Sequence, residues 1–358
     1  GASSSLNGMV SARGHPGGFV HWAQSGLRDW SWEKVLPYFK RAEDSERGDD
    51  DYHGTGGPLH VSTRRDPNEL NDVFLQAARE VGIPLIDDFN GPQAEGAGWY
   101  DSTTSNGSRW SASRAYLAPI RQRPNLEVRT HILVERIVFE GKRAVGVSYR
   151  RGGQLVTVRA GTVISSGGAV NSPRLLMLSG VGPGGHLQEM GIDVVHDSPG
   201  VGSNLQDHFD VIPQWTCRKP VTLNGQARVV NQLRSLVSWL ISKDGAISHA
   251  PTPVGAFFSS REGLASPDIQ LHFMPVKADP HGRGSFLPVH GFQMHVCQLN
   301  PKSRGTVRLA SPNPEAQPLI DPADLSDTSD VDILLKGIEI ARKIVAAPAF
   351  NDYRQAEI

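Results

Sequence analysis

The chain has 358 residues, enough to bury a large core, and this length favours two domains or more. Lys and Arg total 36 against 37 Asp and Glu, a formal net charge of −1, so charge gives no support for nucleic acid as a partner. The 2 cysteines, Cys217 and Cys297, lie far apart and indicate neither a disulfide framework nor a zinc site, so we expect no metal and a reducing compartment, cytoplasmic or peripheral to an inner membrane.

The first 15 residues are rich in glycine and serine, which predicts a loop that enters a helix. Small side chains would let this backbone lie against a flat ring system, and the amide of Asn7 offers both hydrogen-bond donors and acceptors. The alternative is that Asn7 only caps a helix.

An amphipathic helix is predicted within residues 26–43. Ser31 is placed to cap it, and Pro37 should bend or shorten it. Its aromatic residues are expected in the core rather than in a substrate site: Trp30, Trp32, Tyr38 and Phe39.

A second helix is predicted over residues 68–82, where apolar residues recur at helical spacing and a glycine follows. Before it, residues 44–51 are typical of a solvated acidic run, and we interpret His53 in the following turn as a structural residue.

From Leu126 the apolar period changes to two, which predicts a meander of short strands joined by glycine turns. The expected strands are 126–130, 137–139, 145–149 and 156–158. Another strand, Thr162 to Ile164, should lead through glycines into a helix with Ser172 as N-cap, Pro173 at its first position and Gly180 as its stop. A strand that turns into a helix N-terminus is typical of a nucleotide-binding α/β layer.

Residues 180–185 fit G-x-G-x-x-G, but a dinucleotide fingerprint needs a strand before its first glycine. Here a helix is expected before it, so we interpret this run as a glycine-rich loop.

A domain boundary is expected near residues 209–212. Beyond it, strands are predicted at 269–273 and 292–296, and helices at 229–241 and 332–346. We expect the apolar face of the 229–241 helix to pack against the core. Binding to a membrane surface is the less favoured alternative, because few cationic residues lie on this helix.

Two long motifs carry a family resemblance. Gly168-Ala169, Ser172-Pro173, Leu175-Leu176 and Ser179-Gly180-Val181-Gly182, followed by Pro199-Gly200-Val201-Gly202 and Asn204 to His208, resemble the second signature of the glucose–methanol–choline (GMC) oxidoreductases. Residues 1–10 with Arg13-Gly14 resemble the first signature. A third segment, 106–117, resembles the N-G-x-R-x-S-x-x-x-A-Y-L run of the same family; its Arg109 could pair with a phosphate, but an intraprotein salt bridge is the expected role.

The resemblance implies a cofactor and its contacts. GMC enzymes use FAD to oxidise alcohols, and the matching positions imply that Asn7, Gly8, Met9 and Val10 contact the flavin. Val134, in T-x-x-x-V-x-R-I, would lie beside the adenine. Leu6 stands where some relatives have a histidine bonded covalently to FAD, so the resemblance implies non-covalent FAD.

The implied fold is α/β plus α+β: an incomplete Rossmann-like FAD-binding layer with an antiparallel-sheet substrate domain. We assign 1–51 and 106–211 to the FAD-binding domain, and 52–105 and 212–358 to the substrate-binding domain. The diphosphate loop of the family and its C-terminal catalytic histidine find no match in this sequence. We therefore expect a fragment that is inactive alone.

Alcohol oxidation needs a base for the hydroxyl proton, a role that suits histidine. None of the 13 histidines is nominated as catalytic. The substrate implied by the resemblance is a primary alcohol, choline-like or aliphatic, with oxygen or a quinone as electron acceptor. A homo-oligomer is possible, and the sequence does not determine the oligomeric state. The alternatives are an FAD-containing enzyme like the hydroxynitrile lyases and a degenerate, non-catalytic member.

Overall fold

The computed structural model describes all residues except 1, 64, 228, 244–247, 249 and 279–288. It forms two compact units. The first unit consists of Gly1–Leu126, Asp210–Asn300 and Asp332–Ile358, and the second unit of Glu127–Phe209 and Pro301–Val331. These units are defined by packing, and the division of the chain into FAD-binding and substrate-binding segments stays a prediction.

The first unit is built on a seven-stranded sheet in the order β20-β14-β17-β16-β15-β4, with β13 also paired to β17. Its pairings are antiparallel. The strands are β4 (Gly96–Trp99), β13 (Asp210–Val211), β14 (Gln214–Cys217), β15 (Val254–Phe258), β16 (Ile269–Met274), β17 (Gly291–Gln298) and β20 (Arg354–Glu357). The strands predicted at 269–273 and 292–296 are thus confirmed, and an antiparallel sheet dominates this unit.

The two faces of this sheet differ in chemistry because side chains alternate along each strand. On the apolar face, Leu271 pairs with Val296 and Phe273 with Met294, and all four side chains are fully buried. On the other face, polar side chains meet in the same register; we call it the polar face, and its central pairs are Gln270 with Cys297, His272 with His295, and Met274 with Gln293.

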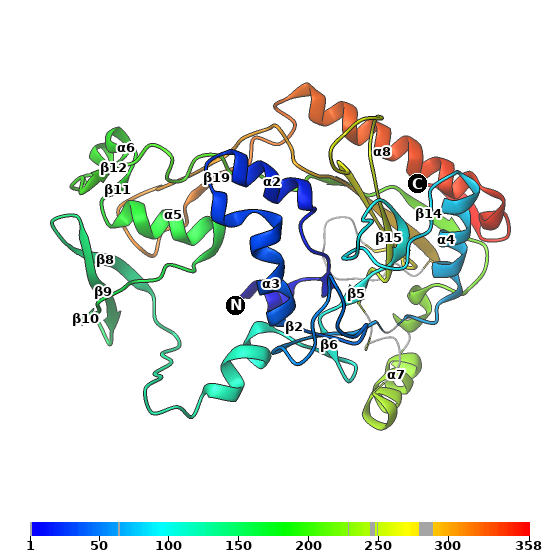
Figure 1. Ribbon diagram of the computed structural model, residues 1–358, viewed down its shortest axis with the longest axis horizontal. Coiled ribbons are helices and arrows are strands. Elements are labelled where there is room, and N and C mark those ends of the chain that lie inside the picture. Colours follow the sequence, from blue (N-terminus) through cyan, green and yellow to red (C-terminus); the bar gives the residue numbers. More distant parts are fainter. Residues whose placement is uncertain (1, 64, 228, 244–247, 249, 279–288) are drawn as a thin grey trace. The chain divides into compact units, whose positions relative to one another are not determined.

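Two helices cover the apolar face, α4 (Glu69–Glu80) and α8 (Thr328–Ala346), and Figure 1 shows α8 lying across the sheet. The Phe74 ring of α4 stacks on Phe273 with centroids 5.0 Å apart. Gly337 lets α8 approach closely, because a Cβ there would lie 2.4 Å from Val296 Cγ1. Asn68 caps α4 by accepting a hydrogen bond from Leu70 N, which confirms the helix predicted at 68–82.

The first unit also contains elements outside this sheet and its two covering helices. They are α1 (Ala2–Leu6), β1 (Val10–Ser11), α2 (Pro16–Gln24), η1 (Arg28–Trp30), α3 (Trp32–Ala42), β2 (Glu43–Ser45), β3 (Leu59–Val61), β5 (Asp101–Ser102), β6 (Thr104–Ser105), β7 (Ser108–Arg109), η2 (Ser113–Leu117), η3 (Ala118–Ile120), η4 (Leu223–Ala227), α7 (Val229–Ser242) and η6 (Pro348–Phe350).

The second unit contains a three-stranded meander, β8 (Val134–Glu140), β9 (Arg143–Arg151) and β10 (Gln154–Arg159), packed against α5 (Gly168–Leu178). Ser179 links them, since its hydroxyl accepts from Ile137 N and donates to Leu175 O. The other elements are β11 (Val181–Gly182), α6 (Gly184–Glu189), β12 (His196–Asp197), β18 (Thr306–Arg308) and β19 (Leu319–Asp321). A small core unites Met177, Leu178, Leu187 and Leu309.

Two predicted strands are absent from this part of the described chain. Residues 126–130 and 162–164 have no regular structure, and Ile164 is 84% exposed. A strand needs a partner for its backbone N–H and C=O groups, and no described strand lies beside either segment. The apolar pattern was read correctly as non-helical, but pattern alone does not supply a partner.

The predicted start of the following helix was also wrong. α5 begins at Gly168, with Gly167 as N-cap, so Ser172 and Pro173 lie inside the helix. Proline lacks an N–H and is most common in the first turn of a helix, which is why the sequence pattern placed the helix start at Pro173. The stop is confirmed: Gly180 has φ +84°. α5 precedes residues 180–185 as expected, but the run is not simply a loop, because it contains β11 (Val181–Gly182) and the first residues of α6, which begins at Gly184.

Two of the aromatic residues expected in the core are at the surface. Trp30 is 54% and Tyr38 62% exposed, whereas Trp32 and Phe39 are half-buried. Trp30 packs on Trp22 with centroids 6.0 Å apart, and the Arg41 guanidinium lies over the Tyr38 ring. These contacts pack the two aromatic side chains against neighbours at the surface without burying them. α3 itself runs through Pro37 from an N-cap at Ser31.

The apolar side chains of α7 that the structure describes do not pack into a core. Leu236, Val237, Leu240 and Ile241 are 44–81% exposed, so the preferred interpretation of this helix was wrong for these residues. The helix is held instead by contact with η4 and by Trp239, whose indole N–H donates to Gly107 O at 2.8 Å. None of the described helices combines the length and apolar character needed to cross a bilayer.

Candidate functional site

The segment expected to contact the flavin, Asn7 to Val10, forms a tight loop between α1 and β1. Asn7 Oδ1 accepts hydrogen bonds from Met9 N at 3.2 Å and from Arg109 Nη1 at 2.7 Å. This is an Asx turn and not a helix cap, because a strand follows. Arg109 therefore contacts Asn7 and the Ser4 carbonyl, where an ion pair was expected.

The backbone of this loop is unusual. Met9 has φ +64°, a left-handed conformation that is uncommon for a residue other than glycine and is often found at functional sites. Gly8 is exposed, and a Cβ there would meet only Pro251 Cγ at 3.8 Å. Its N–H has no partner among the described residues. An exposed donor on a backbone with small side chains fits a flat polar ring system lying close to it.

The loop is fixed to the segment after β4. Val10 pairs with Ser102 in β5, and Met9 O accepts from Thr103 N at 2.8 Å. Tyr100 lies two residues before Ser102 in the chain, and its side chain reaches the polar face of the sheet. One short segment thus joins the loop to that face within the first unit.

The buried side chain of Tyr100 connects the Asn7–Val10 segment to the polar face. Its hydroxyl donates to Leu271 O at 3.1 Å and accepts from Gln270 Nε2 at 3.1 Å, while its ring lies 5.3 Å from the ring of His272. Burial raises the pKa of Tyr100 well above its ordinary value, so the phenol stays protonated. Gly255 makes room for it, because a Cβ there would lie 2.5 Å from the Tyr100 hydroxyl.

A chain of hydrogen bonds crosses the polar face from β14 to β13. Gln214 Nε2 donates to Gln293 Oε1 at 3.1 Å, Gln293 Nε2 lies 3.0 Å from His295 Nε2, and His295 Nδ1 lies 2.5 Å from Asp210 Oδ2. Asp210 is the only acidic residue in strands β13 to β17, all of which the structure describes. Burial and the nearby Asp210 carboxylate raise the pKa of Cys297 to about 12, so its thiol is no nucleophile.

Behind the loop lies a buried ionic cluster centred on His53, whose side chain is 1% exposed. Its Nε2 lies 2.8 Å from Asp88 and its Nδ1 3.2 Å from Glu43, and Arg13 pairs with Glu43 at 2.7 Å. The hydrogen bonds to Asp88 and Glu43 raise the pKa of His53 to about 9. Although burial opposes it, the bond from His53 and the charge of Arg13 hold the pKa of Glu43 below its usual range.

A second ion pair fixes β5. Arg47 binds both carboxylate oxygens of Asp101, at 2.6 and 2.9 Å, and Asp101 pairs with Ser11 of β1. Burial raises the pKa of Asp101, and the bidentate guanidinium opposes that rise. The His53 ring and the Glu43 carboxylate are buried, in agreement with a structural role for His53, whereas Arg47 and Asp101 line a small open pocket.

Val134 lies in β8 of the second unit, half-buried, opposite Tyr149 at an irregularity of the strand pairing. The structure therefore brings Asn7, Gly8, Met9 and Val10 together in one loop, while Val134 belongs to the other unit.

The sequence reasoning missed the polar face. Alternation in β16 and β17 would have placed Gln270 and His272, or Gln293 and His295, on one side of a strand each. The pairing of His272 with His295, and the approach of Asp210, depend on register and could not be read from the alternation.

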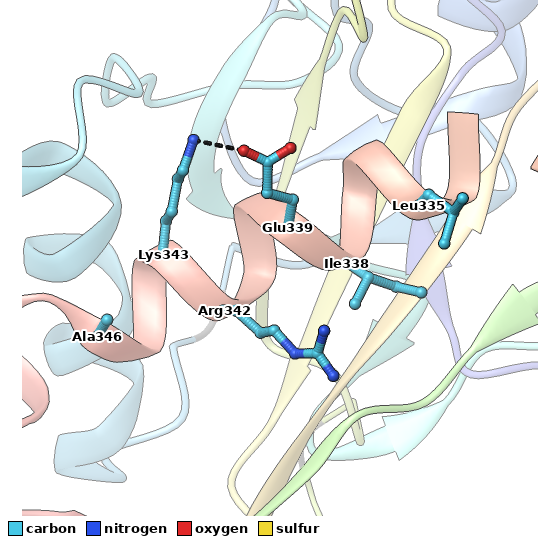
Figure 2. Close-up of a pocket in the computed structure, with 6 residues that line it drawn as sticks. All are labelled: Leu335, Ile338, Glu339, Arg342, Lys343 and Ala346. Carbon is cyan, nitrogen blue, oxygen red and sulfur yellow. Dashed lines mark ion pairs between the residues drawn. The ribbon is translucent and has the colours of Figure 1, made fainter. Parts of the chain in front are cut away.

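A hollow of about 580 Å³ lies on α8 (Figure 2), lined by Leu335, Ile338, Glu339, Arg342, Lys343 and Ala346. It shares no residue with the loop or with the polar face, and α8 covers the opposite side of the sheet. The ion pair between two of its lining residues, Glu339 and Lys343 at 2.8 Å, is an ordinary surface pair along a helix. We therefore exclude it as the reaction site.

Comparison with known proteins agrees with the two motifs. The family model "GMC oxidoreductase" matches residues 1–210 with its N-terminal part and residues 301–357 with its C-terminal part. The chain is 45% identical to "Oxygen-dependent choline dehydrogenase" of Brucella canis and 43% to "Choline dehydrogenase, mitochondrial" of Mus musculus, each over its whole length. It spans 65% and 60% of the lengths of these relatives.

Solved structures show the same fold. Pyridoxine 4-oxidase from Mesorbium loti superimposes with a TM-score of 0.86 at 27% identity, covering 99% of this chain and 67% of the other. Formate oxidase from Aspergillus oryzae gives a TM-score of 0.90 at 21% identity, covering 99% and 68%, and this likeness concerns the fold alone. The mixed α/β fold and the family match agree, and the chain belongs to the GMC oxidoreductase family.

Proposed function

We propose that this protein takes part in the FAD-dependent oxidation of a choline-like primary alcohol to the aldehyde. FAD, when bound, supplies the hydride acceptor for the alcohol carbon. The observation that carries the proposal is the polar face, with its single carboxylate at Asp210, joined through Tyr100 to the Asn7–Val10 loop. The names of the relatives support the substrate class.

For the cofactor, we propose that Gly8 and its neighbours Asn7, Met9 and Val10 lie against the flavin, and that Val134 contacts the adenine. The exposed N–H of Gly8, which has no hydrogen-bond partner in the part of the chain that the structure describes, supports the first contact. Leu6 has no group that could bond covalently to a flavin, which supports non-covalent binding. Molecular oxygen, named in the bacterial relatives, or a quinone would be the final electron acceptor.

For the substrate, we propose that Asp210 attracts the quaternary ammonium of choline. A carboxylate that is one-third exposed at the edge of a buried sheet keeps most of its attraction for a cation, because the low-dielectric surroundings screen it less than water does. A neutral alcohol of the same shape would gain nothing from this charge.

Replacing Asp210 by asparagine tests the proposal. In the intact, FAD-loaded enzyme, Asp210→Asn should raise KM for choline on the order of tenfold, the loss of a partly buried charge pair. KM for the neutral isostere 3,3-dimethylbutan-1-ol should stay the same. Equal effects on both alcohols would argue against a cation site. A protein that acts on a cyanohydrin without bleaching its flavin would be a lyase, which would overturn the proposal as a whole.

A further inference from the structure

The backbone N–H and C=O of one residue, Ala278, orient two side-chain amides of the polar face. Ala278 N donates to Gln293 Oε1 at 3.1 Å, and Ala278 O accepts from Gln214 Nε2 at 2.9 Å. A backbone N–H can only donate, so the atom of Gln293 that faces it must be the oxygen. Gln214 Nε2 donates to the same oxygen. The NH2 group of Gln293 must therefore lie on the other side.

That NH2 group determines which nitrogen of His295 carries the proton. Gln293 Nε2 lies 3.0 Å from His295 Nε2, and an amide NH2 can only donate, so the ring nitrogen must accept. The hydrogen of the neutral ring then lies on Nδ1, which is 2.5 Å from Asp210 Oδ2. Asp210 therefore accepts, as an ionised carboxylate does.

We propose that Gln293 is a positioning residue that fixes the Nδ1–H tautomer of a neutral His295 and thereby holds Asp210 ionised and oriented on the polar face. The geometry also removes His295 as a general base, because its Nε2 lone pair is already taken by Gln293. The tautomer follows from the contacts alone, whereas the role of Asp210 toward a cationic alcohol rests on the proposed function.

Substituting glutamate for Gln293 replaces the hydrogen-bond donor that faces His295 by an acceptor, with almost no change in side-chain shape. Its carboxylate still accepts from Ala278 N and Gln214, but it presents an acceptor to His295 Nε2 in place of a donor. A histidine between two carboxylates binds a second proton. Gln293→Glu should therefore convert His295 to an imidazolium, whose charge balances the added carboxylate and which engages Asp210 in an ion pair that a cationic ligand must compete with.

The tautomer is measured by long-range ¹H–¹⁵N NMR of the histidine-labelled protein. His295→Asn identifies the His295 signals by their loss. At neutral pH we expect one protonated and one unprotonated ring nitrogen in the wild type, with Nδ1 protonated, and two protonated nitrogens in Gln293→Glu. Gln270→Glu, on the same face but bonded to Tyr100, is the matched control and should leave the His295 signals unchanged.

A wild-type ring protonated at Nε2, or at both nitrogens, overturns the proposal without any variant. So does a Gln293→Glu protein whose His295 signals match the wild type. The role of Asp210 has its own readout: Gln293→Glu should raise KM for choline about fivefold, because Asp210 is then engaged by the imidazolium, and should raise KM for 3,3-dimethylbutan-1-ol less. Failure of choline turnover in the wild type would count against the proposed function and not against the tautomer.

Discussion

At the scale of single residues, His53 and His295 of the first unit both contact carboxylates, but their rings are held in different ways. His53 lies between Asp88 and Glu43, so both ring nitrogens face acceptors and the ring is doubly protonated. His295 has an acceptor on one side and a donor on the other, so its ring is neutral. The same residue type therefore supplies a buried cation beneath the loop and a neutral link on the polar face.

The charge of His53 makes stability depend on pH. Because its folded-state pKa is raised to about 9 from an ordinary 6.5, the stabilisation is complete below about pH 6.5 and is lost as pH rises through 9. We expect the free energy of unfolding to fall over this range by up to about 3 kcal/mol. Chemical denaturation at several pH values measures it.

His53→Gln is the comparison for that measurement. The variant should be less stable at pH 6.5, by up to about 3 kcal/mol, because Asp88 and Glu43 lose the His53 cation, although Glu43 keeps its ion pair with Arg13. It should also show a flatter pH dependence between 6.5 and 9. Wild-type and variant curves that run parallel would show that His53 does not titrate in this window.

At the scale of elements, α8 is held close to the sheet at one position. Gly337 is buried, and an added Cβ would lie 2.4 Å from Val296 Cγ1 and 3.3 Å from Ile269 Cγ2. Alanine is the better helix former by about 1 kcal/mol, but the clash with packed strands should outweigh this gain. We expect Gly337→Ala to destabilise the protein by about 2 kcal/mol in denaturant unfolding.

Gly18 in α2 provides the matched control, because a Cβ there meets nothing within 4 Å. Gly18→Ala should be neutral or stabilise by up to about 1 kcal/mol. Val296→Ala should partly rescue Gly337→Ala by removing the methyl group that clashes. Similar effects of the two glycine substitutions would mean that helix propensity, and not close packing, determines the result.

At the scale of the whole molecule, the sequence predicted what depends on neighbouring residues. α4 was predictable because Asn68 caps it and its apolar residues recur at helical spacing. Thr162 to Ile164 failed because a strand exists only with a partner elsewhere in the chain. His295 and Asp210, 85 residues apart, meet only through the register of β13 on β17. The family resemblance identified the Asn7–Val10 segment, which periodicity did not.

The two units also differ in how much they bury. In β16 and β17 nearly every residue is buried, whereas β10 of the second unit is exposed along almost its whole length. The core of the second unit joins only Met177, Leu178, Leu187 and Leu309. Amide exchange follows local opening, and local opening is easiest where little apolar surface is buried.

We therefore expect hydrogen exchange followed by mass spectrometry to show slow exchange in peptides from 269–274 and 291–298. Exchange in peptides from 154–159 should be at least about tenfold faster. A difference of more than about 1.4 kcal/mol in the free energy of local opening would give this ratio. β10 is an edge strand paired only with β9, whereas β16 and β17 each have a partner strand on both sides, so fewer backbone hydrogen bonds and lower burial both favour faster exchange in β10. Equal protection of the two sets would mean that the sheets open as one cooperative body, with stability set by the whole chain instead of by the local core.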